Sequence, residues 1–492
     1  MKKILSYILG WAVAASMLPG CSSFLEESSQ DEIRPSTTND LAQLLLGEGY
    51  PRNSFFIGYL DLMTDDVESA YNTRQGEYLR RGRAPFTWST DVFEEMSAAS
   101  TEGITTWQDY YNQISGCNVV MDNLDKVTGS EEDKANLRGQ ALALRAYYYF
   151  MLVNVFAEPY NAAGVDVTTS PGVPIILESA VTDYFPERKS IAEVYARIEA
   201  DLLEAAPLME QYGTNNGNSK VTDLFVHLLL SRVYLYMERW DEVIEEADYV
   251  IKKRPNLINL STYWSSASMN VYATGSPERI WGYSSFMEYE DFFYGSNNGQ
   301  DAFFVSKDLL GIYEVEYDEW NVEYSGDLRY IYYYELDNNY DQPTPVSPFK
   351  NQTQAVRTTD YQKGFRVAEA YLNRAEANIR LYLEDGSEER RQSALADLNH
   401  LREYRFDSYP GDSDYSGEAL LDFCKTERRR ELSFDDHRWF DLRRYGKPAL
   451  THSFSMESGP QQTYTLEEGS SRYVLRIPQV VMLRNPALVQ NP

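Results

Sequence analysis

Aromatic side chains are concentrated in one stretch of the chain, between Tyr263 and Tyr334. In this stretch 20 of 72 residues are Phe, Trp or Tyr, against 14% in the whole sequence. Flat rings stack on the C–H faces of sugars, while neighbouring amides and carboxylates bond the hydroxyl groups. The pattern favours an oligosaccharide-binding surface, the alternative being rings that pack in the core. The polar side chains available beside the rings are Asn270, Glu288, Asn297, Asn298 and Gln300.

Some of these aromatic residues lie in loop-like, polar surroundings and are predicted to contact a ligand. Two more come from an earlier loop, where Asn72 and Arg74 lie close in sequence. Tyr332-Tyr333-Tyr334, in contrast, alternates like a strand and is expected to be half-buried. The predicted ligand contacts are Tyr71, Tyr78, Trp264, Tyr272, Tyr283, Tyr289 and Tyr294.

The residue patterns of common catalytic and metal sites are absent from the sequence. There is no Gly-rich phosphate loop, no HExxH and no GxSxG, and the four histidines are scattered. Asp337, Asn339 and Asp341 alternate like the start of a calcium loop, but Gln342 and Pro348 replace its glycine and closing glutamate. We therefore predict no metal, no cofactor and no catalysis. A surface glycoside hydrolase is the alternative, since two suitable carboxylates could occur among 75 acidic residues.

The N-terminus has the form of a secretory signal. Lys2 and Lys3 precede an apolar run from Ile4 to Leu18, which is too short for a comfortable membrane span. Leu18-Pro19-Gly20-Cys21 resembles a bacterial lipobox, so lipidation is predicted at Cys21. We expect a signal peptide at 1–20, a polar tether at 21–38 and a single domain at 39–492.

Composition narrows the class of partner. The formal net charge of −30 argues against nucleic acid and against an anionic membrane surface. Besides Cys21, only Cys117 and Cys424 are present, both in helix-like sequence. They are predicted to be buried free thiols, with one disulfide as the alternative.

A helical scaffold must position the aromatic loops. Apolar residues recur every three or four positions from Leu224 to Ile251, with Ser231, Tyr234 and Pro255 at the characteristic positions of a tetratricopeptide repeat (TPR). We predict a mainly α fold with TPR-like units at about 107–156, 221–255 and 365–405 and a few short strands. The long irregular regions expected between and before these units are Asp65–Thr101, Tyr160–Lys189 and a ligand-loop insertion at about 256–357.

Several segments, in order along the chain, resemble the SusD/RagB family of outer-membrane nutrient-binding lipoproteins. Its C-terminal signature is matched by Glu427-Arg428-Arg429-Arg430-Glu431-Leu432 followed by Arg438-Trp439-Phe440-Asp441-Leu442-Arg443-Arg444. We expect this signature to form helix-surface and buried ion pairs around a core containing Trp439 and Phe440. The other matching segments are Trp107–Asn118, Arg138–Phe150, Tyr371–Ala377 and Asn485–Pro492.

The resemblance implies a function as well as a fold. It implies a surface-exposed, lipid-anchored protein of the cell outer membrane that binds an oligosaccharide, or alternatively a peptide. It further implies delivery of the ligand to a SusC-like TonB-dependent transporter. The chain departs from the family pattern at two places. Asp435-Asp436 stands where Glu-Gly is usual, and Val481 stands where glutamate is common.

Overall fold

The computed structural model describes most of the chain. The described residues are 35–51, 57–69, 76–99, 105–180, 183–214, 220–265, 271–273, 275–284, 292–293, 302–320, 323–337, 344–348, 363–456 and 460–492. Within them, no helix is both long and apolar enough to cross a membrane.

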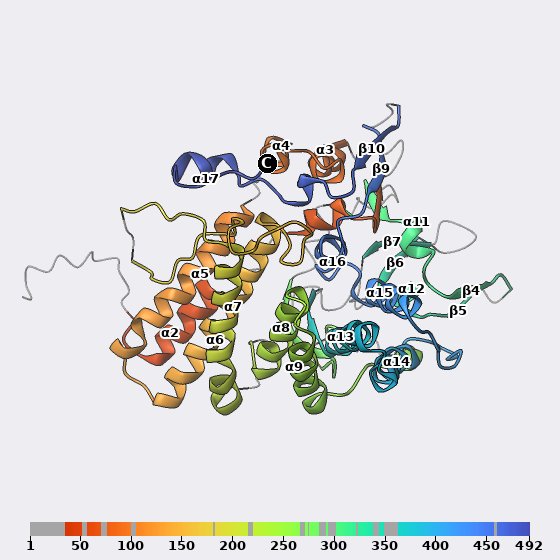
Figure 1. Ribbon diagram of the computed structural model, residues 1–492, viewed down its shortest axis with the longest axis horizontal. Coiled ribbons are helices and arrows are strands. Elements are labelled where there is room, and N and C mark those ends of the chain that lie inside the picture. The colour runs from red at the N-terminus through yellow and green to blue at the C-terminus, as the bar shows by residue number, and fades with distance from the viewer. Residues whose placement is uncertain are drawn as a thin grey trace, which may run out of the picture.

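Helices dominate the fold and stack side by side (Figure 1). Neighbours in the stack include α5 with α6, α6 with α7, α8 with α9, and α13 with both α9 and α14. The α-helices are α2 (Thr38–Leu44), α3 (Gly76–Phe86), α4 (Val92–Ala99), α5 (Thr106–Asn123), α6 (Glu131–Phe156), α7 (Ile191–Tyr212), α8 (Asp223–Tyr236), α9 (Trp240–Lys253), α11 (Lys307–Leu310), α12 (Arg329–Tyr332), α13 (Val367–Asp385), α14 (Glu388–Glu403), α15 (Glu418–Leu432), α16 (Arg438–Arg444) and α17 (Gln479–Arg484).

The longest of these helices, α6, lies at the centre of the N-terminal half. The side chain of Ser130 caps its first turn by accepting from the backbone N–H of Asp133. From Gly139 to Phe156 every residue is buried, because α2, α5, α7 and α8 all contact the helix. A helix that is covered on all sides has no need of a polar face.

Each of the three predicted TPR-like units spans a pair of contacting helices: α5–α6, α8–α9 and α13–α14. Ser231 is fully buried, and its hydroxyl accepts a 2.9 Å hydrogen bond from the side chain of Asn373. The carbonyl of Pro255 accepts from the hydroxyl of Tyr371 at 2.9 Å. These polar contacts join α8–α9 to α13, so neighbouring units form one continuous scaffold.

Two parts of the chain have more helix than the sequence analysis predicted. The region Asp65–Thr101, expected to be irregular, contains α3 and α4. There Gly82 of α3 packs so closely on Phe303 that a Cβ would lie 2.2 Å from the ring. In addition, α7 begins with a capping box formed by Ser190 and Glu193 and contributes a buried face against α6.

The strands are short and form antiparallel pairs. Tyr332 and Tyr333, expected in a strand, instead end and follow α12, and only Tyr334 begins a strand. The strands are β1 (Val67–Ser69), β2 (Arg279–Ser284), β3 (Phe303–Val305), β4 (Val315–Asp318), β5 (Glu323–Gly326), β6 (Tyr334–Asp337), β7 (Thr344–Pro348), β8 (Lys363–Arg366), β9 (Leu450–Phe454) and β10 (Gln462–Leu466). Short helical turns are η2 (Leu45–Gly49), η3 (Gly58–Met63), η4 (Leu124–Lys126), η5 (Leu260–Ser265) and η7 (Ser471–Tyr473).

The two cysteines of the domain are free and buried, as predicted. Cys117 lies in α5 and Cys424 in α15, and both are fully buried. Burial raises the pKa of the Cys117 thiol to about 12. These thiols are therefore core residues and not reactive groups.

Candidate functional site

Strand pairing gathers the ends of the predicted ligand loops. In the β2–β8 pair Ser284 lies opposite Lys363. In the β1–β3 pair Ser69 lies opposite Phe303. We call these two strand pairs the loop base, because they flank the predicted ligand loops in the sequence.

Close backbone packing fixes the β2–β8 pair. Trp281 pairs with Phe365, and Gly282 pairs with Gly364. A Cβ at Gly364 would lie only 2.1 Å from the carbonyl oxygen of Trp281. Only glycine permits this approach of two backbones.

The turn between α15 and α16, residues 433–437, forms part of the same base. Phe434 contacts the ring of Phe293 edge-on, with centroids 5.6 Å apart. Asp435 accepts a 3.0 Å hydrogen bond from Arg366 at the end of β8. This turn therefore connects the signature helices to the strands and loops of the insertion.

Asp436 binds two groups of the strand pair. Its carboxylate contacts the ammonium of Lys363 at 2.5 Å and accepts from the hydroxyl of Tyr283 at 2.9 Å. Lys363 is fully buried and also lies 3.3 Å from the carboxylate of Asp61 in η3. The backbone of Asp436 is left-handed, with φ of 62°, which explains why glycine is usual here in related sequences. In this chain Asp436 has a strained backbone, and its carboxylate binds Lys363 and Tyr283 at the loop base.

Replacing Asp436 with glycine should destabilise the protein although it relieves backbone strain. Loss of the carboxylate removes the ion pair that Asp436 forms with the buried Lys363. Breaking a buried ion pair from one side costs about 3–5 kcal/mol. Relief of the left-handed strain returns about 1 kcal/mol. We expect a net loss of about 2–4 kcal/mol in the free energy of unfolding, measured by urea denaturation.

Lys447→Gly is the matched control for that substitution. Lys447 has a similar φ of 53°, but its ammonium is only part-buried on Glu158. This variant should lose little or no stability. An Asp436→Gly protein as stable as the wild type would show that the carboxylate does not hold the loop base.

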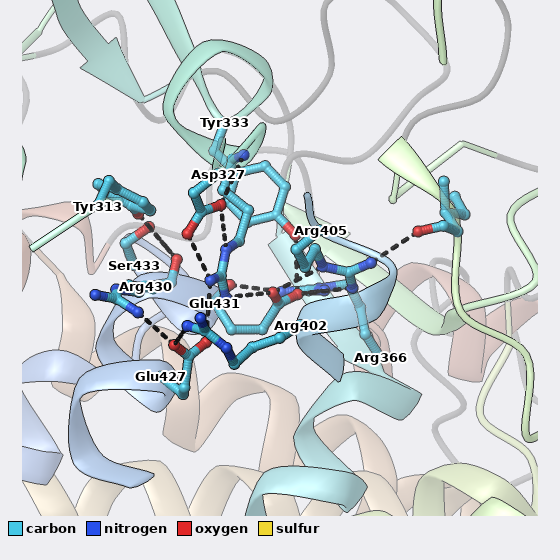
Figure 2. A network of polar contacts seen from close by, with 12 residues as sticks. Tyr313, Asp327, Tyr333, Arg366, Arg402, Arg405, Glu427, Arg430, Glu431 and Ser433 are labelled. Carbon is cyan, nitrogen blue, oxygen red and sulfur yellow. Dashed lines mark hydrogen bonds and ion pairs between the residues drawn. The ribbon is translucent and has the colours of Figure 1, made fainter. Parts of the chain in front are cut away.

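A network of buried charges lies beneath this base (Figure 2). Glu431 of α15 is its centre and is fully buried. It accepts from Arg366 at 2.6 Å, from Arg405 at 2.9 Å and from Tyr333 at 2.8 Å. Burial by itself would raise the pKa of Glu431, but the charges of Arg405 and Arg366 hold it well below its usual range.

The network extends from Glu431 into the insertion and the last TPR-like unit. Arg329 bonds Asp327 at 2.7 Å and Glu427 at 3.0 Å. Arg405 also bonds Glu278, whose carboxylate accepts from the backbone of Ile258. Five separate chain segments, around residues 278, 327–329, 366, 405 and 427–431, are thus joined through charged hydrogen bonds, and the network fixes the insertion on the scaffold.

The signature residues form the predicted ion pairs, with one exception. Arg428 bonds Asp441 at 2.9 Å, and Arg438 bonds Asp65 through two hydrogen bonds. Arg443, predicted to pair, forms no ion pair with any described residue and donates to the backbone carbonyl of Ala157. Its burial lowers its pKa to about 10. Trp439 lies in the core, as predicted.

Two of the predicted ligand contacts are core residues. Tyr272 is fully buried, and its hydroxyl accepts from Arg366 at 3.1 Å. Tyr283 packs against Trp281 and Phe365 with its hydroxyl on Asp436, and burial raises its pKa well above the usual value. The prediction that these two rings face a ligand is wrong, because the β2–β8 pair and α15–α16 cover them.

The other predicted contacts lie at the edge of the described structure or beyond it. Tyr78 is half-buried on α3. Trp264 belongs to η5, but its side chain is outside the described residues. Tyr71, Tyr289 and Tyr294, and the calcium-like residues Asn339 and Asp341, are also outside them. Among the described residues no group of His, Cys, Asp and Glu is arranged to hold a metal ion.

Two family models match most of the chain. Residues 24–235 match a SusD-like model described as "Starch-binding associating with outer membrane", and residues 281–492 match the model of the SusD family. The chain belongs to the SusD/RagB family. Within this SusD/RagB protein, Glu427 and Glu431 of the network lie in the signature segment, whereas Arg329, Arg366 and Arg405 come from outside it.

Relatives with known names and structures agree with the SusD/RagB fold. SusD-like protein P25 from Formosa agariphila is 23% identical over 226 residues, 42% of this chain, and the match spans 43% of that relative's length. A SusD superfamily protein from Bacteroides thetaiotaomicron has a TM-score of 0.71 at 21% identity, covering 93% of this chain and 100% of that one.

Two structures from Bacteroides vulgatus are similar to the same degree. A putative sugar binding protein has a TM-score of 0.69 at 24% identity and covers 94% of this chain and 99% of its own. A SusD-like carbohydrate binding protein has a TM-score of 0.67 at 21% identity, covering 92% and 97%. At these identities the likeness establishes the fold.

The sequence analysis missed some residues that build the loop base. Asp61 and Lys363 belong to no recognisable motif. Glu278 and Asp327 lie in the aromatic insertion, where no sequence pattern indicates that they form buried ion pairs. The sequence signal for the loop base was Asp436, which stands where glycine is usual. A residue that replaces glycine at a left-handed position is expected to make a stabilising contact with its side chain.

Proposed function

We propose that this protein binds a nutrient oligosaccharide at the cell surface and delivers it to a TonB-dependent outer-membrane transporter, without catalysis. The observation that carries the proposal is the pairing of the strands that flank the aromatic loops in the sequence. Ser69 lies opposite Phe303 and Ser284 lies opposite Lys363, so chain segments far apart in the sequence meet at the loop base.

Physical chemistry and the comparisons both support a sugar ligand. Aromatic rings suit stacking on sugar faces, and paired strands at the ends of a binding loop reduce the entropy lost on binding. Similar structures include proteins described as sugar binding and carbohydrate binding. A ligand that is bound and passed on requires no catalytic group. A bound peptide is the alternative within the same class.

The outer-membrane location is part of the proposal. Cys21 ends a lipobox-like segment, and residues 22–34 separate it from the first described residue, Pro35. One matched family model is described as associating with the outer membrane. Incorporation of labelled fatty acid into the protein in cells tests the lipid anchor, and copurification with the transporter from detergent-solubilised membranes tests the partner.

Calorimetric titration of the chain that begins after Cys21 tests ligand binding. Against a panel of oligosaccharides and peptides, we expect binding to one glycan class, with the glycan recovered intact. Tyr71→Ala and Tyr294→Ala should each weaken binding about 10-fold, since loss of one stacking ring costs about 1–2 kcal/mol.

Tyr415→Ala is the control for these titrations. Tyr415 is 43% exposed and packs on Phe423, in the connection between α14 and α15. Its removal should leave glycan affinity unchanged. Binding of peptides alone would transfer the proposal to a peptide ligand, and cleavage of any glycan would overturn the non-catalytic function.

A further inference from the structure

A second candidate binding surface lies between the start of α5 and the C-terminal helix α17. A cavity of about 400 Å³ is enclosed by the start of α5, residues 174–186 and the C-terminal helix α17. Trp107 and Tyr111 form its floor, one turn apart on α5, with ring centroids 5.1 Å apart. The cavity is lined by Thr105, Trp107, Gln108, Tyr111, Pro174, Ile176, Pro186, Pro478, Val480, Val481, Arg484, Asn485 and Leu488.

Large apolar residues are exposed in the segments that form this cavity. Val480 lines it, and the others lie within two positions of a lining residue in the sequence. We call these residues the apolar rim. Large apolar groups are usually scattered singly on a protein surface, so their occurrence in these segments favours an apolar partner. The exposed residues are Leu177 (40%), Tyr184 (66%), Phe185 (53%), Val480 (54%), Leu483 (75%) and Val489 (68%).

Hydrogen bonds hold the walls of the cavity in place. The hydroxyl of Tyr111 donates to the carbonyl of Pro174 at 2.8 Å, which orients the floor. Asn485 donates to the carbonyl of Pro186 at 2.9 Å, joining the C-terminal segment to the opposite wall. Figure 1 shows α17 beside α4, and Gln479 and Glu94 bond across this contact. The cavity is thus formed before any ligand arrives, which lowers the cost of binding.

Two residues give the cavity its chemical preference. Val481, at the position where related sequences commonly have glutamate, contributes an apolar side chain to the wall. Arg484 is exposed at the edge, and no ion pair joins it to any described residue. In a chain of net charge −30, an unpaired cation beside an apolar wall is a distinctive feature.

We propose that this cavity binds an extended, apolar segment of a partner protein that carries a carboxylate beside Arg484. Apolar side chains fit the walls of valine, isoleucine and proline, and grooves lined by aromatic rings are known to accept extended peptides. Charge complementarity places the partner's carboxylate at Arg484. This proposal is separate from glycan binding at the loop base and does not depend on it.

Sugar and lipid ligands suit this cavity less well. A glycan would leave many hydroxyl groups against apolar walls, where an unbonded polar group is costly. An anionic membrane surface would be repelled by the exposed carboxylates of Glu178, Asp183 and Glu187, which adjoin the apolar rim in sequence. An apolar polypeptide segment avoids the first cost, and it reduces the second because it brings a single carboxylate, which lies at Arg484.

Fluorescence anisotropy with labelled synthetic peptides tests the proposal. The probe is an amidated decapeptide of alternating leucine and proline with one aspartate near its C-terminus. A second labelled peptide carries lysine in place of that aspartate. The wild-type chain should bind the aspartate peptide at least about 10-fold more tightly, and Arg484→Glu should reverse that preference.

Val481→Glu is the decisive variant. It introduces the residue that is common in related sequences, so the chain should fold, and it should weaken binding of both peptides at least about 10-fold. Leu203→Glu is the control, because Leu203 is 50% exposed on α7 and does not line the cavity. It should leave both affinities unchanged.

Three results would overturn the proposal. The first is equal affinity of the wild-type protein for the two peptides. The second is peptide binding by Val481→Glu that is as tight as that of the wild type. The third is binding of the wild type to phosphatidylglycerol vesicles in preference to the peptides. Thermal melting of each variant establishes that it is folded before its affinity is compared. Glycan titration of Val481→Glu should match the wild type, which keeps failure here distinct from failure at the loop base.

Discussion

Glu431→Gln should remove a large part of the stability of the fold. The glutamine keeps the shape of the side chain but leaves Arg366, Arg405 and Arg329 with less negative charge in a fully buried site. Breaking a buried ion pair from one side costs about 3–5 kcal/mol, because the remaining charges stay desolvated. Proteins of ordinary stability have only about 5–15 kcal/mol in total. We therefore expect a loss of at least about 3 kcal/mol.

Urea denaturation followed by tryptophan fluorescence measures this effect. A shift in the midpoint with an unchanged slope reports a loss of stability in a two-state transition. Glu388→Gln is the matched control, because Glu388 bonds Arg391 at the surface with 64% of its side chain exposed. Its midpoint should not move. If Glu431→Gln unfolds within about 1 kcal/mol of the wild type, the network does not anchor the insertion as inferred.

Acid should destabilise the protein steeply between pH 5 and pH 2. Burial would raise the pKa values of Glu376 and Glu427, but Arg444 beside Glu376, and Arg329 with two further arginines beside Glu427, lower both to about 2. In the unfolded chain these carboxyls titrate near 4.5. The folded state thus binds fewer protons. The stability that these two carboxylates contribute is complete above pH 5 and is lost as the pH falls through 4.5 toward 2.

The expected size of the acid effect is about 3 kcal/mol for each of these two carboxyls, at 1.36 kcal/mol for each pKa unit. Asp66 and Asp397 act in the opposite direction, because burial raises their pKa values. The free energy of unfolding, measured in urea at pH 7, 5, 4 and 3, should fall below pH 5.

Glu376→Gln separates this cause from general acid effects. The variant should be less stable at pH 7 and should lose less stability between pH 5 and pH 3. Glu245 provides the control, since its carboxylate is exposed on α9, away from the buried ion pairs. Glu245→Gln should follow the wild-type curve. A stability that stays constant down to pH 3 would contradict the assignment.

Local sequence determined the helical scaffold and much of its charge pairing. Apolar spacing placed α8 and α9, because a buried stripe repeats every three or four residues whatever lies opposite. The signature spacing placed Arg428 within reach of Asp441, since both are on consecutive helices joined by a short turn. The two buried thiols followed from composition and helical position.

Only the tertiary structure decided which aromatic rings are core. Tyr272 and Tyr283 lie in sequence that resembles a loop, but Tyr283 is part of β2, which pairs with β8 about 80 residues later, and Tyr272 contacts Arg366 at the end of β8. The partners of Glu431 are likewise brought together from the insertion and from α13–α14. Burial depends on contacts between distant segments. The periodicity of a single sequence indicates which face of an element is buried, but it does not indicate which segment packs against that face. The cavity at Val481 was invisible for the same reason.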